Sequence, residues 1–143
     1  MAIVKSGSAR YEGLGKGGKG HVSTGSGALA DQPYGFNTRF EDAPGTNPEE
    51  LIAAAHASCF TMATSFALAG AGYSDGRLDT DCAVTLEKDG AGFKVTRSAL
   101  TLKAAVPGIS QDDFARIADE AKANCPISKL LNAEITLETS FGS

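Results

Sequence analysis

Three cysteines are the residues of this chain best suited to chemistry. Cys59, Cys82 and Cys125 are an odd number of thiols at wide spacings, which does not suit the disulfide framework of a small secreted domain. A cysteine reacts as its thiolate, and a free thiol loses its proton only near about pH 8.5, so a reactive cysteine needs a nearby cation or hydrogen-bond donors. The pattern directs attention to thiol chemistry in a reducing compartment.

The local sequence gives each cysteine a different setting. Cys82 lies in a predicted strand, where a thiol usually acts as a small buried hydrophobe. Cys59 lies within a predicted helix, one turn after His56, and a helical cysteine is more often a core residue than a catalytic one. Cys125 lies at a predicted helix end beside Pro126, which suits both a presented resolving thiol and simple burial. These local patterns leave both interpretations open.

Charged side chains that would lower the pKa of a thiol precede this helix. Arg39 ends a predicted strand that carries Phe36 and Phe40, and Glu49 and Glu50 open the next element. An arginine paired with a carboxylate near a cysteine would stabilise the thiolate. An exposed salt bridge worth about 0–1 kcal/mol is the more common outcome for such a pair.

Other candidate sites have less support. The glycine-rich run Gly13 to Gly20 fits G-x-G-x-x-G twice, but a polar strand is predicted after it, not the helix that a dinucleotide site requires. His21, His56 and the cysteines contain no pair at zinc-ligand spacing. The net charge of −4 and the scattered Lys and Arg residues argue against a nucleic-acid partner. We therefore expect neither a metal site nor nucleic-acid binding.

The composition predicts one globular domain over residues 1–143, with an aliphatic core, since apolar residues make up 42% and there is no Trp. The longest apolar stretch, residues 51–72, is interrupted by polar side chains and preceded by two carboxylates, which favours a buried helix over a membrane span. The first thirteen residues lack the apolar segment and cleavage site of a secretory signal, so we expect a cytoplasmic protein without membrane contact.

The predicted elements alternate strands and helices and give an α+β class with antiparallel sheets. Strands are expected over residues 2–5, 20–24, 34–40, 77–87, 93–105 and 133–139. Helices are expected over residues 48–72 and 111–123, the second one capped by Ser110, with a short turn over 127–131. Asn47 and Pro48 are strong start signals for the first helix, which is apolar or small almost all round and should therefore lie in the middle of the structure.

A longer stretch of sequence is more informative than the spacing of single residues. The run from Gly45 to Phe60, GTNPEELIAAAHASCF, closely resembles the signature of the OsmC family, the osmotically inducible peroxiredoxins related to the organic hydroperoxide resistance proteins. Further segments agree in the same order: KGHVST, QPYGFNTRFE, AVPGI and NCPISKLLNAEITL. The resemblance extends over essentially the whole chain.

This resemblance implies an OsmC-like fold in which two chains intertwine as a homodimer, with two central helices and active sites at the subunit interface. It implies that Cys59 is the peroxidatic thiol, Cys125 the resolving thiol, Arg39 the cation that stabilises the thiolate, and Glu49 the carboxylate that orients Arg39. Cys59 would reduce a hydroperoxide, organic or hydrogen peroxide, and become a sulfenic acid, and Cys125 would close a disulfide that an external dithiol, of lipoyl type in this family, reduces. No cofactor is implied.

Two alternatives stay open beside this peroxidase. Cys59 and His56 could be a nucleophile and base for acyl transfer, although no side chain that would orient His56 is evident. A dimer that binds hydrophobic ligands or senses redox state, with the Cys59–Cys125 bond as a switch only, would be oxidised once without turnover.

Overall fold

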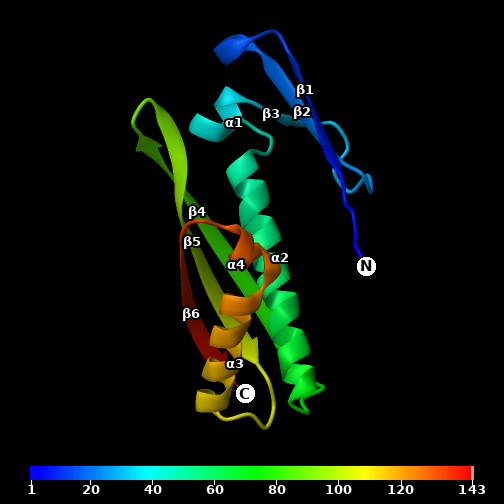
Figure 1. Cartoon of the computed structure of the whole chain (residues 1–143), viewed down its shortest axis with the longest axis vertical. Coiled ribbons are helices and arrows are strands. Elements are labelled where there is room, and N and C mark those ends of the chain that lie inside the picture. The colour runs from blue at the N-terminus through cyan, green and yellow to red at the C-terminus, as the bar shows by residue number, and fades with distance from the viewer. Residues whose placement is uncertain (143) are drawn as a thin grey trace. The chain divides into compact units, whose positions relative to one another are not determined.

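The computed structural model describes residues 1–142 and consists of two compact units, Met1–Leu51 and a second unit from Ile52 onward (Figure 1). Each unit contains one three-stranded sheet. Helices and strands occur in both units, so the predicted α+β class is confirmed. The single domain over residues 1–143 stays a prediction.

The first unit is an antiparallel sheet followed by a short helix. β1 (Gly7–Glu12), β2 (Lys19–Thr24) and β3 (Gln32–Tyr34) pair in that order, and α1 (Phe36–Phe40) comes next. The glycine-rich run between β1 and β2 contains a 3-10 turn, η1 (Gly15–Gly17), and leads into a strand, as predicted. It therefore lacks the strand-to-helix context of a dinucleotide site.

The predicted strand over residues 2–5 is wrong. The ladder between β1 and β2 ends at Gly7, opposite Thr24, and β2 itself ends at Thr24. No strand residue of β2 therefore lies opposite residues 2–5, and their β-branched side chains alone do not make a strand.

The predicted strand over residues 34–40 is also wrong beyond its first residue. The Gly35 N–H donates to Thr38 Oγ1 at 2.8 Å, which closes the first turn of α1. Phe36 and Phe40 are four residues apart, so they share one helix face, with ring centroids 5.0 Å apart. Arg39 consequently lies on a helix instead of at a strand end.

α2 (Pro48–Gly70) starts where the sequence predicts and continues from the first unit into the second. The Glu50 N–H donates to Asn47 Oδ1 at 2.8 Å, so Asn47 is the N-cap. Glu49 and Glu50 lie in the first turn, where their charges complement the positive end of the helix dipole.

The burial of α2 differs from the expectation of a helix enclosed on all sides. The buried residues recur every four positions and form one stripe: His56, Phe60, Thr64 and Leu68. Met62 and Phe66 remain 61% and 72% exposed, because one chain provides a layer on one side of the helix only. α2 is long enough to span a membrane, and its mean hydropathy over 18 residues is 1.5, which is apolar enough for a span. Core helices of soluble proteins meet the same two criteria.

The second unit contains a mixed sheet. β4 (Arg77–Asp89) and β5 (Gly92–Ala105) form the predicted antiparallel hairpin, with Gly90 in its turn at φ 61°. β6 (Glu134–Gly142) pairs with β5 in parallel, so the prediction of purely antiparallel sheets does not hold here. Two helices connect β5 to β6, and such a crossover is the usual way to bring a strand back in parallel.

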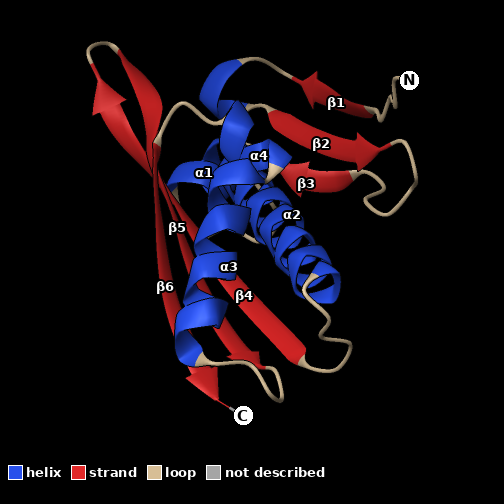
Figure 2. Cartoon of the chain, turned by 60° about the horizontal axis from the view of Figure 1, so that its bottom comes forward, coloured by secondary structure: helices blue, strands red, loops and turns tan. Residues whose placement is uncertain are grey.

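α3 (Gln111–Asn124) and α2 pack against the same face of this sheet (Figure 2). The Asp113 N–H donates to Ser110 Oγ at 3.1 Å, so Ser110 is the predicted cap. α4 (Pro126–Leu130) replaces the predicted turn over 127–131. The core joins both helices to β5 and includes Phe60, Leu68, Leu100, Leu102, Phe114, Ile117 and Cys125.

Candidate active site

Cys59 and Cys125 come together in the second unit. Cys59 is half-buried on α2, and Cys125 is fully buried at the junction of two helices, ending α3 and beginning α4. Pro126 follows as the first residue of α4, which fixes the bend that presents Cys125. The two thiols are close enough for each to shift the pKa of the other, and they are not joined by a disulfide.

Backbone N–H groups at the start of α4 surround this thiol pair. The N–H groups of Ile127 and Ser128 act to lower the pKa of Cys125, and that of Ile127 also acts to lower the pKa of Cys59. A sulfur that accepts several N–H bonds is stabilised in its charged form. The first turn of α4 is therefore built to hold negative charge on the pair.

The two thiols differ in acidity. Burial raises the pKa of Cys59, and the bond to Cys125 raises it further, while Ile127 N–H only partly opposes this. Burial also acts to raise the pKa of Cys125, but the bonds from Ser128, Cys59 and Ile127 outweigh it and leave that pKa lowered. Within this unit alone, Cys125 is therefore the more acidic of the two thiols.

Arg39 and Glu49 form a two-point ion pair in the first unit. Arg39 Nε donates to Glu49 Oε1 and Arg39 Nη2 donates to Glu49 Oε2, both at 2.8 Å. The Glu49 side chain is only 13% exposed, and the Arg39 side chain is 36% exposed. This is the fork geometry that holds a guanidinium plane in one orientation. Glu50 instead accepts from Thr46 Oγ1 at 2.7 Å and does not share in the pair.

A pocket of about 320 Å³ opens beside Arg39 within the first unit. Its walls include four aromatic side chains, Tyr11, Tyr34, Phe36 and Phe40. The guanidinium carbon of Arg39 lies 5.4 Å from the centroid of the Phe40 ring. The pocket thus combines an oriented cation with an apolar wall, which suits a ligand with a polar head and a hydrocarbon body.

His56 contacts two serines and no cysteine directly. Its Nδ1 is 2.6 Å from Ser98 Oγ and its Nε2 is 2.7 Å from Ser128 Oγ, and the side chain is fully buried. Burial lowers the pKa of His56, so the ring is neutral. Because both nitrogens are already bonded to hydroxyls, His56 is not the base for Cys59 that acyl transfer would require.

The sequence analysis did not identify Ser98 or Ser128, and it predicted only a packing role for Cys82. Cys82 packs against the core, as predicted, but its Sγ is also 3.1 Å from Ser98 Oγ. Ser98 lies on the inward face of β5 with Leu100 and Leu102, and that alternation was a usable signal. A hydroxyl at an inward position needs a buried partner. Ser128 carries no comparable signal.

The sequence matches a family model described as OsmC-like protein over residues 40–140. The chain is 56% identical to Peroxiredoxin OsmC of Escherichia coli over all 143 residues, which covers 100% of both chains. Its fold is similar to the crystal structure of the organic hydroperoxide resistance protein OhrB of Bacillus subtilis, with a TM-score of 0.73, 26% identity and coverage of 96% and 98% of the two chains.

An OsmC-like protein of unknown function from Vibrio cholerae has the same fold, with a TM-score of 0.78 at 16% identity, over 97% of this chain and 100% of the other. The family model matches well over half of the residues, and the Escherichia coli relative matches from end to end. By these two findings, the chain is a member of the OsmC family.

Proposed function

We propose that this chain is a peroxiredoxin-type hydroperoxide reductase in which Cys59 reduces the peroxide and Cys125 resolves the product. The closeness of the two thiols is the observation that carries the proposal: Cys59 packs against the core that includes Cys125, and each thiol shifts the pKa of the other, so a sulfenic acid on Cys59 would form near a second sulfur. The chain is 56% identical over its whole length to Peroxiredoxin OsmC of Escherichia coli, which supports the class of activity, a peroxidase of antioxidant and stress defence.

The cycle balances without a cofactor. Cys59 thiolate attacks one peroxide oxygen, the O–O bond breaks, and the leaving alkoxide takes a proton to become an alcohol, or hydroxide becomes water. Cys125 thiolate then attacks the sulfenic sulfur, the S–S bond forms, and hydroxide leaves and is protonated to water. An external dithiol gives two electrons and two protons to restore both thiols; we propose a lipoyl-type dithiol for this role.

Arg39 and Glu49 supply the cation in this cycle. Alone, the second unit prefers the charge on Cys125, so Cys59 needs an added positive charge to become the attacking thiolate. We propose that the Arg39 guanidinium provides it and also hydrogen-bonds the peroxide oxygens, with Glu49 fixing its orientation. The aromatic pocket beside Arg39 favours organic hydroperoxides, which carry a hydrocarbon body, over hydrogen peroxide.

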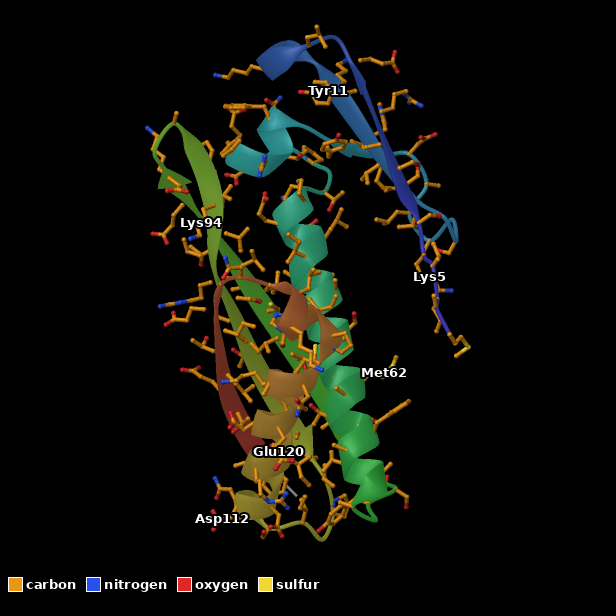
Figure 3. All side chains as sticks on the ribbon, viewed as in Figure 1. Lys5, Tyr11, Met62, Lys94, Asp112 and Glu120 are labelled. Atoms are coloured by element: carbon orange, nitrogen blue, oxygen red, sulfur yellow. The ribbon has the colours of Figure 1, made fainter. Side chains whose placement is uncertain are left out.

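A homodimer with active sites at its interface is part of this proposal. In the first unit, Gly20 is the sole buried residue among residues 1–51, and a three-stranded sheet that buries no apolar side chain needs a covering layer. On α2, the Met62 side chain projects away from α3 into solvent (Figure 3), and Phe66 is also exposed. A second copy that covers these surfaces would also enclose α2, as its all-round apolar sequence predicts.

The cellular location stays a prediction: we expect the protein in the cytoplasm, where thiols are kept reduced between turnovers. The catalytic cycle and the rival redox switch differ in one observable, sustained consumption of peroxide. With cumene hydroperoxide and dihydrolipoamide in excess, we expect many turnovers per thiol pair. A single oxidation that stops after one equivalent, although dithiol is present, would favour the switch and overturn the enzyme.

A further inference from the structure

A second cation, Lys16, lies at the aromatic pocket of the first unit, and the proposed cycle gives it no role. Lys16 and Arg39 both line this pocket of about 320 Å³, and none of the described residues that line it is acidic. The Lys16 Nζ lies 4.6 Å from the centroid of the Phe36 ring, and the Arg39 guanidinium carbon lies 5.4 Å from that of Phe40. Because these two ring centroids are 5.0 Å apart, the two cations stand against adjoining rings of one pocket.

The two cations differ in whether their charge is neutralised. Arg39 is paired with Glu49 at two points, so its charge is largely balanced. Lys16 takes part in none of the ion pairs among the described residues, and its ammonium contacts a ring instead. An ammonium has three donors, and an aromatic face occupies only part of them. Lys16 is therefore the uncompensated charge of this pocket.

The glycine-rich run between β1 and β2 carries Lys16 to the pocket. Gly15 has a φ of 72°, in the left-handed region that favours glycine. The Tyr11 hydroxyl donates to the Gly15 carbonyl at 2.8 Å, and a Cβ on Gly18 would lie only 2.3 Å from the Tyr11 ring. The run therefore folds closely over a wall residue of the pocket, which fixes the point from which the Lys16 side chain extends.

The pocket presents ring surface as well as charge. Tyr11 and Phe40 are 38% and 40% exposed, so the hydrocarbon body of a ligand can cover them. The chain as a whole carries a net charge of −4, which disfavours the approach of anions. A local cation beside the rings therefore decides whether a hydroperoxide with a negative group binds here, and Lys16 is placed to supply it.

We propose that Lys16 is a specificity-determining residue that makes this chain prefer organic hydroperoxides that carry a carboxylate. The hydrocarbon body lies against the aromatic rings, the carboxylate pairs with Lys16, and the peroxide group lies toward Arg39. This inference rests on the proposed function and deepens it by naming the substrate class. The chemistry is that of the proposed cycle: Cys59 breaks the O–O bond, and the product is a hydroxy acid that keeps its carboxylate.

Two substrates that differ only in charge test this preference. The acid is para-carboxycumene hydroperoxide, and its methyl ester is neutral with the same ring and the same peroxide group. With dihydrolipoamide as reductant, we expect kcat/KM to be higher for the acid than for the ester. Lys16 is exposed, so its ion pair is screened by solvent, and we expect a preference of about threefold to fivefold. The preference should disappear at about 1 M salt, where the screening length is about 3 Å.

Variants of two lysines assign the preference to one residue. Lys16→Gln removes the charge and should lower the acid-to-ester ratio of kcat/KM by about threefold to fivefold, whereas Lys16→Arg should preserve the ratio within about twofold. Lys19→Gln is the matched control, because Lys19 is also exposed and follows the same glycine-rich run, but it lines another pocket. The ratio compares two substrates on one variant, so a loss of folded protein cancels from it.

A binding measurement needs no turnover and separates this inference from the proposed cycle. The probe is para-isopropylbenzoate, which has the ring and the carboxylate but no peroxide, and its methyl ester is the neutral comparison. Tyr11 and Tyr34 line the pocket, and the third tyrosine, Tyr73, lies in the second unit and serves as an internal reference for the NMR signals of the rings. The acid should shift the signals of Tyr11 and Tyr34 at a lower concentration than the ester, and Lys16→Gln should remove that difference.

The specificity role is overturned if Lys16→Gln lowers the acid-to-ester ratio no more than Lys19→Gln does, or if the acid shifts only the Tyr73 signals. If both hydroperoxides are reduced equally well, the proposed cycle stands and this inference fails. If the acid binds beside Tyr11 and Tyr34 through Lys16 but neither hydroperoxide is turned over, the charge selection by the pocket stands and the proposed peroxidase cycle fails.

Discussion

Replacing Glu49 by Gln should slow peroxide reduction by loosening Arg39. The glutamine side chain keeps one carbonyl oxygen as an acceptor for Arg39 but has an NH2 group in place of the second acceptor oxygen. One of the two 2.8 Å hydrogen bonds is therefore lost, and the remaining one goes to a neutral acceptor instead of a carboxylate. A hydrogen bond to a charged group contributes about 1.5–3 kcal/mol. Because the Arg39 side chain is 36% exposed, solvent screening favours the lower end of that range.

That lower end corresponds to a loss of about tenfold in kcat/KM, if the whole difference is felt in the transition state. The assay is steady-state reduction of cumene hydroperoxide with dihydrolipoamide, with circular dichroism to confirm folding. Glu50→Gln is the matched control: it is the neighbouring carboxylate in the same helix turn, it bonds to Thr46, and its loss should leave kcat/KM within about twofold. Unchanged kcat/KM in Glu49→Gln would refute the orienting role of Glu49.

Three more outcomes follow from the structure. Cys59→Ser should abolish turnover, whereas Cys125→Ser should allow one oxidation and then accumulate sulfinic acid on Cys59, which mass spectrometry would detect; full activity in Cys59→Ser would contradict the mechanism. If the proposed homodimer covers α2, Phe66→Glu should convert it to monomers in sedimentation, while the exposed Gln111→Glu should not; a dimer that Phe66→Glu leaves unchanged would place the interface elsewhere. Burial lowers the pKa of His56 below its usual value of 6.5, so below about pH 6.5 the unfolded chain binds a proton that the folded chain does not. The free energy of unfolding should therefore fall as the pH drops through 6.5. In His56→Gln, the urea midpoint should depend less on pH over this range.

Local signals predicted the parts of the fold that depend on neighbouring residues. The starts of α2 and α3 were predictable because the caps Asn47 and Ser110 act within one turn. α1 was not, because Phe36 and Phe40 fit a strand edge as well as a helix face, and the Gly35–Thr38 contact decides between them. The parallel pairing of β6 depends on a crossover through two helices, which no short window of sequence records.

The candidate site divides in the same way. Spacing identified thiols and a cation as candidates, but only the folded chain brings Cys59 and Cys125 close together, since Cys59 lies within one helix and Cys125 lies where two others meet. Ser128 was missed because serine is common on surfaces, and its importance depends on a long-range contact with His56. The lowered pKa of Cys125 also depends on N–H groups of α4, which are backbone features without a sequence signature.

The central claim is that Cys59 and Cys125 act as a peroxidatic and resolving pair, and one titration tests it. Thiols are counted before and after one equivalent of cumene hydroperoxide, and the product is mapped by mass spectrometry. We predict rapid loss of two thiols, a Cys59–Cys125 disulfide, and an intact Cys82. Three unreacted thiols, or a disulfide that includes Cys82, would contradict the account.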